Sequence, residues 1–463
     1  MRILALLMST IALGGCFHVK NQLYNPDSAV TRVVHGKPQQ VEHQSVVKVF
    51  TDHDTVDPDC IPAANACLAF LEFDEMGEMW DPGQLDKAIE LIKRAKKLSP
   101  HPIVVTFTHG WKNNAKDEAG HVNGNVFGFE GVLDFLEHPP VAHRFADSPI
   151  VGIYIGWRGN LVSQYWPVRQ QLSYFNREGA AIRIPGASLT AALTRIMQET
   201  HRDPAGARAI MVGHSFGGLV MERALSQAMA DYILRGGGQN GDDGAWADLV
   251  VFVNSAAAAS EGKQMLDLFK RLETTRNYKF VVTPEAAALE KSQTPALART
   301  AQRPMFLSIS SLGDIATRFG LVIGHGPSAL SRQFTGSWRT YENPDIPSVP
   351  SQRSYYLSTT AHMEVLQSHL IVENTQQGLK QCGQLFSPSP VKLSTGQQYI
   401  ICEKPNRWND TPYWAMEMPA TIVPDHSVIF NLNFIALLEK FLPSQAEMEN
   451  PDLMPKPQAT PLQ

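Results

Sequence analysis

The chain has 463 residues, of which 43% are hydrophobic and 18% are charged, and its formal net charge is −5. A chain of this length and composition can bury a substantial core in one large domain or two ordinary ones, which excludes disorder throughout. The slightly negative charge and the lack of a basic block argue against a nucleic-acid partner.

The first sixteen residues have the features of an export signal. Arg2 is followed by an apolar run and then by Leu13-Gly14-Gly15-Cys16. The run is too short to span a membrane, and the tetrapeptide resembles the lipobox of bacterial lipoproteins, whose cysteine becomes the lipidated first residue. We therefore predict a signal peptide at 1–15 and a membrane anchor on Cys16; an ordinary signal peptide cleaved nearby is the alternative. In a diderm bacterium, Phe17 in place of an aspartate favours the outer membrane, by resemblance to the known sorting pattern.

Four cysteines remain after Cys16, and an even number suits an exported protein. Pairing each with its neighbour in sequence closes the smallest loops, so we expect disulfides between Cys60 and Cys67 and between Cys382 and Cys402. No C-x-x-C motif is present and no histidine clusters near these thiols, so no metal site is expected.

Residues 16–44 are polar and lack a hydrophobic period, which suits a tether between lipid and domain. Strands are expected near 46–50 and 67–73, and a helix follows in which Leu85, Ala88 and Ile92 recur at helical spacing.

Continuous apolar runs along the rest of the chain predict strands buried on both faces. These runs lie at 103–107, 150–155, 209–212, 249–253 and 305–309. Helices are expected between them, near 128–137, near 187–198 and after residue 216. This alternation predicts an α/β fold with a mostly parallel central sheet and helices on both faces. The domain should span 45–441, followed by a Pro-rich, disordered tail at 442–463.

Two stretches interrupt the alternation and are candidate lids. Residues 157–180 are rich in aromatic side chains, including Trp157, Tyr174 and Phe175, whereas residues 315–425 are rich in Pro, Ser and Thr. The aromatic side chains either pack within the domain or line a pocket for an acyl chain, and the sequence leaves both options open.

A glycine-flanked serine marks the most informative turn of the chain. Gly213-His214-Ser215-Phe216-Gly217 lies between a predicted strand and a predicted helix. A serine on such a sharp turn has an exposed hydroxyl, and the two glycines remove Cβ atoms that would clash across the bend. We predict that Ser215 is a nucleophile; a glycine-rich turn without catalytic function is the alternative.

With this turn, with the strand and helix order, and with His109-Gly110 after a central strand, residues 45–441 resemble the α/β-hydrolase superfamily. Residues 67–73 and Gly156-Trp157-Arg158 are also similar to bacterial esterase-like hydrolases. The resemblance implies an α/β-hydrolase fold with lid-like insertions and a serine hydrolase of the carboxylesterase or lipase type, which works without a cofactor.

The resemblance also implies where the acid and the base lie. The acid is expected on the loop after the strand at 305–309, which points to Asp314; for this residue a helix N-cap is the alternative. The base is expected on a loop before a terminal helix, predicted at 428–438, which points to His426. His325, His362 and His369 lie in the long insertion and are weaker rivals.

The oxyanion hole of this superfamily uses the amide after the nucleophile and an amide in the loop after the third strand. These positions correspond to Phe216 and to Trp111, with Gly110 as the alternative donor. His109 is expected to hydrogen-bond within that loop rather than to act as a base.

The leading hypothesis is a serine hydrolase that cleaves a carboxylic ester, possibly a lipidic one, through an acyl-enzyme at the cell envelope. Its substrate partner would be a small-molecule or lipid ester. An acyltransferase or an amidase would use the same residues, and an envelope lipoprotein that only binds a ligand on a hydrolase scaffold is the non-catalytic alternative.

Overall fold

The computed structural model describes the strands at 29–34, 37–42 and 47–49 and most of the chain from residue 66 to 442. The described ranges are 66–99, 101–115, 124–137, 148–161, 167–202, 207–234, 247–276, 304–332, 351–382, 390–404 and 411–442. Cys16, Cys60, the predicted signal peptide and the tail from residue 443 lie outside them.

Within the described residues, eight strands form the main sheet in the order β13-β9-β8-β7-β5-β6-β4-β3. Neighbouring strands run parallel from β13 to β4, and only β3 pairs antiparallel, at one edge. The strands are β3 (Val47–Val49), β4 (Cys67–Glu72), β5 (Ile103–Thr108), β6 (Ile150–Gly156), β7 (Arg208–His214), β8 (Leu249–Val253), β9 (Phe306–Ser311) and β13 (Tyr413–Met418). The predicted mostly parallel sheet is confirmed.

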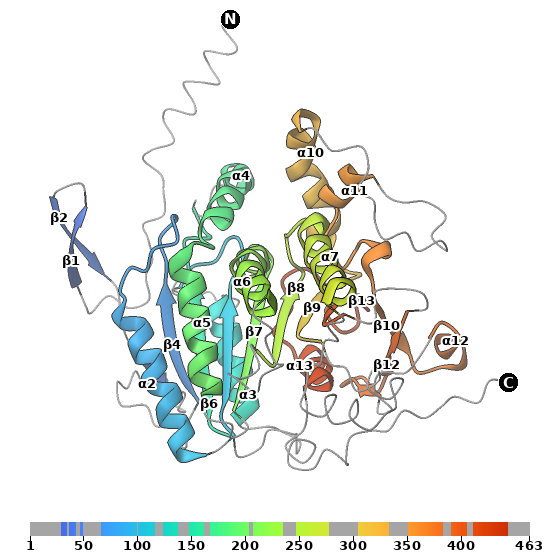
Figure 1. Ribbon diagram of the computed structural model, residues 1–463, viewed down its shortest axis with the longest axis horizontal. Coiled ribbons are helices and arrows are strands. Elements are labelled where there is room, and N and C mark those ends of the chain that lie inside the picture. The colour runs from blue at the N-terminus through green and yellow to red at the C-terminus, as the bar shows by residue number, and fades with distance from the viewer. Residues whose placement is uncertain are drawn as a thin grey trace, which may run out of the picture.

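Helices cover both faces of this sheet (Figure 1). Successive strand residues belong to different cores, as Ala69 and Phe70 do, because side chains alternate across a strand. One core includes α2 (Gly83–Leu98), α5 (Ala187–His201), α6 (Phe216–Leu234) and α7 (Ala259–Arg276), and the other includes α3 (Asn125–Glu137) and α13 (Leu432–Leu438). Burial on both faces accounts for the continuous apolar runs. No helix in the described part of the chain combines the length and the apolar character needed to cross a membrane.

The predicted insertion at 315–425 extends too far, because β13 at its end is a strand of the main sheet. It pairs in parallel with β9, with Tyr413 opposite Phe306. The remaining insertion contains a small antiparallel sheet and several short helices. These elements are η2 (Ala316–Gly320), α10 (Leu321–Ser331), α11 (Gln352–Tyr356), η3 (Glu364–Leu366), β10 (His369–Glu373), α12 (Gln376–Leu379), β11 (Val391–Lys392) and β12 (Gln398–Glu403).

Two further boundaries differ from the sequence prediction. The tether predicted at 16–44 contains a hairpin, β1 (Ala29–Val34) with β2 (Lys37–Glu42). It was missed because β2 is mostly polar and the apolar residues of β1 occur in adjacent pairs rather than in alternation. The terminal helix begins at Leu432 rather than at residue 428, because the side chain of Asn431 caps it by accepting the amide of Phe434 at 3.0 Å. The chain then closes with the short helix η4 (Glu439–Phe441).

The second predicted disulfide is confirmed. Cys382 and Cys402 are bonded, with their Cα atoms 5.5 Å apart, and they connect the end of α12 to β12. Cys67 is also disulfide-bonded. Its predicted partner, Cys60, lies outside the described residues.

Candidate active site

Ser215 lies on a sharp turn between β7 and α6. Its φ angle is +57°, in the left-handed region that residues other than glycine seldom adopt. A Cβ atom on Gly213 would lie 2.7 Å from the carbonyl oxygen of Gly217, and one on Gly217 would lie 2.1 Å from that of Thr108. Glycine is therefore required on both sides of the serine, and the strand–turn–helix geometry predicted from the sequence is present.

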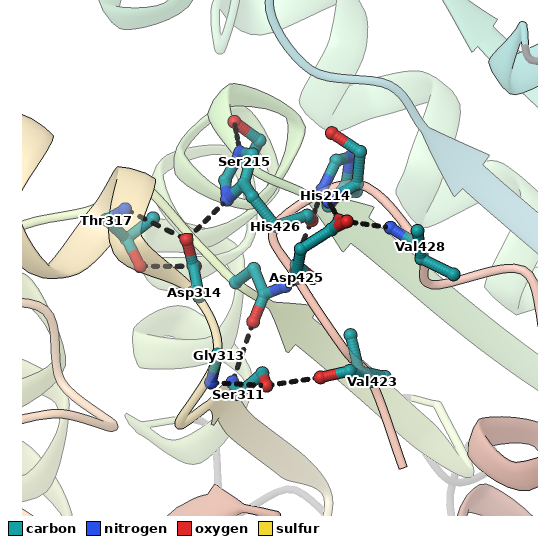
Figure 2. Close-up of polar contacts among 12 residues, drawn as sticks. His214, Ser215, Ser311, Gly313, Asp314, Thr317, Val423, Asp425, His426 and Val428 are labelled. Carbon is teal, nitrogen blue, oxygen red and sulfur yellow. Dashed lines mark hydrogen bonds and ion pairs between the residues drawn. The ribbon is translucent and has the colours of Figure 1, made fainter. Parts of the chain in front are cut away.

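The structure brings Ser215, His426 and Asp314 into one hydrogen-bonded series (Figure 2). Nε2 of His426 lies 2.9 Å from Oγ of Ser215, and Nδ1 lies 2.9 Å from Oδ1 of Asp314. Asp314 is fully buried, whereas the side chain of His426 is 22% exposed. A buried carboxylate, a partly accessible imidazole and a serine hydroxyl thus have the geometry of a catalytic triad.

Asp314 serves a helix and the histidine at the same time. It directly precedes the helical segment that begins at Ile315, and its Oδ1 accepts the amide of Thr317 at 3.0 Å. The hydroxyl of Thr317 donates to its Oδ2. Burial raises the pKa of Asp314, but the hydrogen bond and charge of His426 and the bonds from Thr317 outweigh burial and hold the pKa below its usual value. The two functions considered for this residue are therefore not alternatives.

Two residues that sequence reasoning missed hold the His426 loop. Nε2 of His214 lies 2.8 Å from the carbonyl oxygen of His426, and the side-chain amide of Asn254 donates to the same oxygen at 3.0 Å. The Oδ1 of Asn254 also accepts the amide of Ser311 at 2.8 Å. The one available signal was position, since His214 ends β7 and Asn254 directly follows β8, at the edge where parallel strands place functional groups.

His214 is neutral. Burial, followed by the nearby charge of His426, lowers the pKa of His214 to about 3. Its Nε2–H therefore donates to the carbonyl of His426, while its Nδ1 is buried without a hydrogen-bond partner in the described part of the chain. A neutral ring next to His426 supports the loop without adding a repelling charge.

The loop predicted to supply one oxyanion donor lies against Ser215. A Cβ atom on Gly110 would lie only 2.6 Å from the Cβ of Ser215, so the loop after β5 packs directly against the serine. Among the described residues, no acceptor is bonded to the backbone amides of Trp111 and Phe216. The absence of such a partner leaves the oxyanion hole at Trp111 and Phe216 as a prediction.

His109 holds this loop in place. Its Nε2 accepts the amide of Trp157 at 3.1 Å, so its Nδ1 carries the hydrogen donated to the carbonyl of Gly110 at 2.9 Å. Burial lowers the pKa of His109 to about 4, and its ring stacks on Trp157. His109 is therefore bonded within the loop and not to Ser215, as expected.

The three rival histidines have other contacts. His325 bonds Glu178, and His369 is buried and stacks on Trp414 with ring centroids 3.5 Å apart. His362 lies 2.8 Å from Glu417, near Asp314 rather than Ser215. The structure therefore brings only His426, of the predicted candidates, to the serine.

Some of the aromatic side chains in the predicted lid at 157–180 are packed in the domain, and others are exposed. Trp157 is buried, and Tyr174 of α4 (Pro167–Arg183) packs on Phe216 with ring centroids 5.1 Å apart. Phe175 is half exposed and lines a cavity of about 940 Å³ between α4, α6, α7 and α10. The amide of Ala256, in the same wall, donates to the carbonyl of Ser215 at 3.0 Å. The cavity thus adjoins the turn that carries Ser215, although Ser215 and His426 are not among the residues that line it.

An exposed apolar helix face begins directly after Asp314. Ile315, Phe319, Ile323 and Leu330 recur at helical spacing and are 69%, 60%, 73% and 77% exposed. Ile323 and Leu330 belong to α10, which stands beside α4 at one end of the molecule (Figure 1). Apolar side chains therefore border the site on its solvent side.

Within the described ranges, no group of three or more His, Cys, Asp or Glu side chains is arranged to hold a metal ion. The chain was also compared with protein-family models, with curated proteins and with solved structures, and none of the three comparisons found a match.

Proposed function

We propose that this protein is a serine hydrolase of the carboxylesterase or lipase type, built on an α/β-hydrolase fold. The observation that carries the proposal is the hydrogen-bonded series from Asp314 through His426 to Ser215. The serine lies on a strained turn, and no acceptor among the described residues binds the backbone amides of Trp111 and Phe216. A serine hydroxyl, a base, an orienting carboxylate and an oxyanion hole are the four parts that acyl transfer needs.

In the proposed reaction, Oγ of Ser215 attacks the ester carbonyl carbon while Nε2 of His426 takes the hydroxyl proton. The amides of Phe216 and Trp111 stabilise the negative oxygen of the tetrahedral intermediate. Its collapse breaks the C–O bond, and His426 returns the proton to the leaving alcohol. A water molecule then attacks the acyl-enzyme by the same route, releasing the acid and regenerating Ser215. Because His426 supplies every proton transfer, the proposal includes no cofactor.

Two observations support an ester with an apolar portion. The cavity next to the Ser215 turn is lined by apolar side chains, including Phe175, Leu219 and Met265, together with charged groups. The exposed face of the helix from Ile315 to Ser331 offers further apolar contact. An amphiphilic ester would fit this combination of surfaces.

The test is covalent labelling of the purified chain with a fluorophosphonate, followed by assays of esters of varied acyl length, phospholipids, thioesters and amides. We expect labelling, turnover of esters and no effect of a chelator. Preferred transfer to an added alcohol would identify an acyltransferase, and turnover of amides alone an amidase. If the protein is neither labelled nor able to turn over any of these substrates, catalysis is contradicted, and a lipoprotein that only binds a ligand is the remaining alternative.

We also propose that the protein is exported and anchored by lipid on Cys16, where it would meet envelope esters. Substitution Cys16→Ser should release it from the membrane fraction, because the lipid provides the anchor. Mass spectrometry of the mature N-terminus measures the modification directly. An unmodified Cys16, or cleavage at another position, would contradict the anchor without affecting the proposed chemistry.

A further inference from the structure

A second histidine–carboxylate pair lies directly behind Asp314. Nδ1 of His362 is 2.8 Å from Oε1 of Glu417, and Nε2 of His362 is 3.4 Å from the hydroxyl oxygen of Thr317. Thr317 donates its hydroxyl hydrogen to Oδ2 of Asp314 (Figure 2). The contacts form an unbroken series from Glu417 to the carboxylate that bonds His426.

The pair is built into the fold rather than placed on its surface. Thr317 belongs to η2, His362 to the loop before η3, and Glu417 to β13. The side chain of His362 is only 4% exposed and that of Glu417 is 25% exposed. Arg318, whose guanidinium is 4.0 Å from Glu417, lies on the more exposed side. Burying such a pair costs desolvation free energy, so its contacts require a structural or functional reason.

The hydrogen-bond directions run toward Asp314. The hydroxyl of Thr317 has one hydrogen, and the shorter contact gives it to Asp314, so a lone pair faces Nε2 of His362. Burial raises the pKa of Glu417, but the hydrogen bond and charge of His362 lower it below its usual value, so Glu417 is a carboxylate. It accepts the Nδ1–H of His362. Glu417 thereby fixes the hydrogen on Nδ1 of His362, and Nε2 of the ring faces the hydroxyl oxygen of Thr317 at 3.4 Å.

Thr317 holds both oxygens of the Asp314 carboxylate. Its backbone amide donates to Oδ1 at 3.0 Å and its hydroxyl donates to Oδ2, so the carboxyl group is restrained from rotating and Oδ1 stays 2.9 Å from Nδ1 of His426. The ring of His214 also packs against His426, and it is neutral because its pKa is lowered.

We propose that Thr317, His362 and Glu417 are positioning residues that orient the Asp314 carboxylate toward His426. This inference rests on the proposed function, because it assigns them to the same site. The hydroxyl of Thr317 makes the direct contact, and the His362–Glu417 pair keeps that hydroxyl directed at Asp314.

The first test compares two substitutions of one side chain. Thr317→Val removes the hydroxyl with little change of shape and should lower kcat by about 10- to 100-fold, as expected for a lost bond to a charged group. KM should change by less than about threefold, since substrate contacts are untouched. Thr317→Ser keeps the hydroxyl and should retain most of the activity. Circular dichroism of each variant checks that the fold is intact.

The second test separates charge from shape. Glu417→Gln keeps the shape of the side chain but removes the carboxylate charge, and it should move the acidic limb of the kcat/KM profile down by about 0.5 pH unit, because negative charge favours the imidazolium of His426. Glu417→Asp keeps the charge and should leave the limb in place. A purely structural pair would change kcat in both variants without moving the limb in only one of them.

A spectroscopic measurement makes the inference independent of turnover. The proton between His426 and Asp314 should give a far-downfield proton NMR signal in the free protein, assigned by its loss in Asp314→Asn. We expect the signal to shift or broaden in Thr317→Val and to persist in Thr317→Ser. If the signal responds in this way but no ester is hydrolysed, the proposed function fails and the positioning holds. Equal signals and activities in the two Thr317 variants would overturn the positioning.

Discussion

Substituting Ser215 by alanine is expected to lower kcat for ester hydrolysis by about 10⁶-fold, the loss typical of removing a triad nucleophile. The hydroxyl is the only proposed atom that can form the acyl-enzyme, and it lies 2.9 Å from its base. Stopped assays with concentrated enzyme would measure the residual rate, and fluorophosphonate labelling should disappear. A residual rate above the rate in water would reflect binding and the oxyanion amides alone.

A matched control is the same substitution at an exposed serine of α10, Ser331→Ala, which should leave kcat and labelling unchanged because this hydroxyl lies outside the proposed site. Hydrolysis at the original rate in Ser215→Ala would show that another group is the nucleophile. The assignments of His426 and Asp314 would then lose their basis as well.

Substituting Asp314 by asparagine should lower kcat by about 10⁴-fold, less than the loss at the serine. The amide can still accept the backbone N–H of Thr317, so the helix start should survive. It cannot stabilise the imidazolium of His426, and it permits the tautomer in which Nε2 carries the hydrogen and cannot accept one from Ser215. Pre-steady-state measurement of acylation by a chromogenic ester would detect the slowed step directly.

The neighbouring carboxylate of Asp425 provides the control for this charge. Its Oδ1 accepts the amides of Ser427 at 2.8 Å and Val428 at 3.1 Å, a function that asparagine can perform equally well. Asp425→Asn should therefore keep kcat within about threefold of the original value. If Asp314→Asn is as active as Asp425→Asn, the acid lies elsewhere, while the assignment of Ser215 stands.

Local sequence patterns were sufficient for the parts of the site that depend on local geometry. The turn at Ser215 needs glycine where an added Cβ atom would lie within 3 Å of neighbouring backbone, and glycines mark those positions in the sequence. The loop after β5 was found because it directly follows a buried strand. Asp314 could be selected because it follows the strand at 305–309, and His426 because it precedes a terminal helix; both positions are what the resemblance to the α/β-hydrolase superfamily implies.

By itself, the sequence determined the alternation of apolar runs and amphipathic helices, and hence the parallel sheet with its two separate cores, because burial on both faces requires an unbroken apolar run. Only the tertiary structure decided which polar groups meet at the strand ends. Asn254 bonds a carbonyl 172 residues away, and His362 bonds a carboxylate 55 residues away. Such contacts depend on the order of strands in the sheet. They also depend on β13, a strand that was not predicted because its residues were assigned to the insertion at 315–425. No local period encodes that order, because it follows from how the whole chain packs.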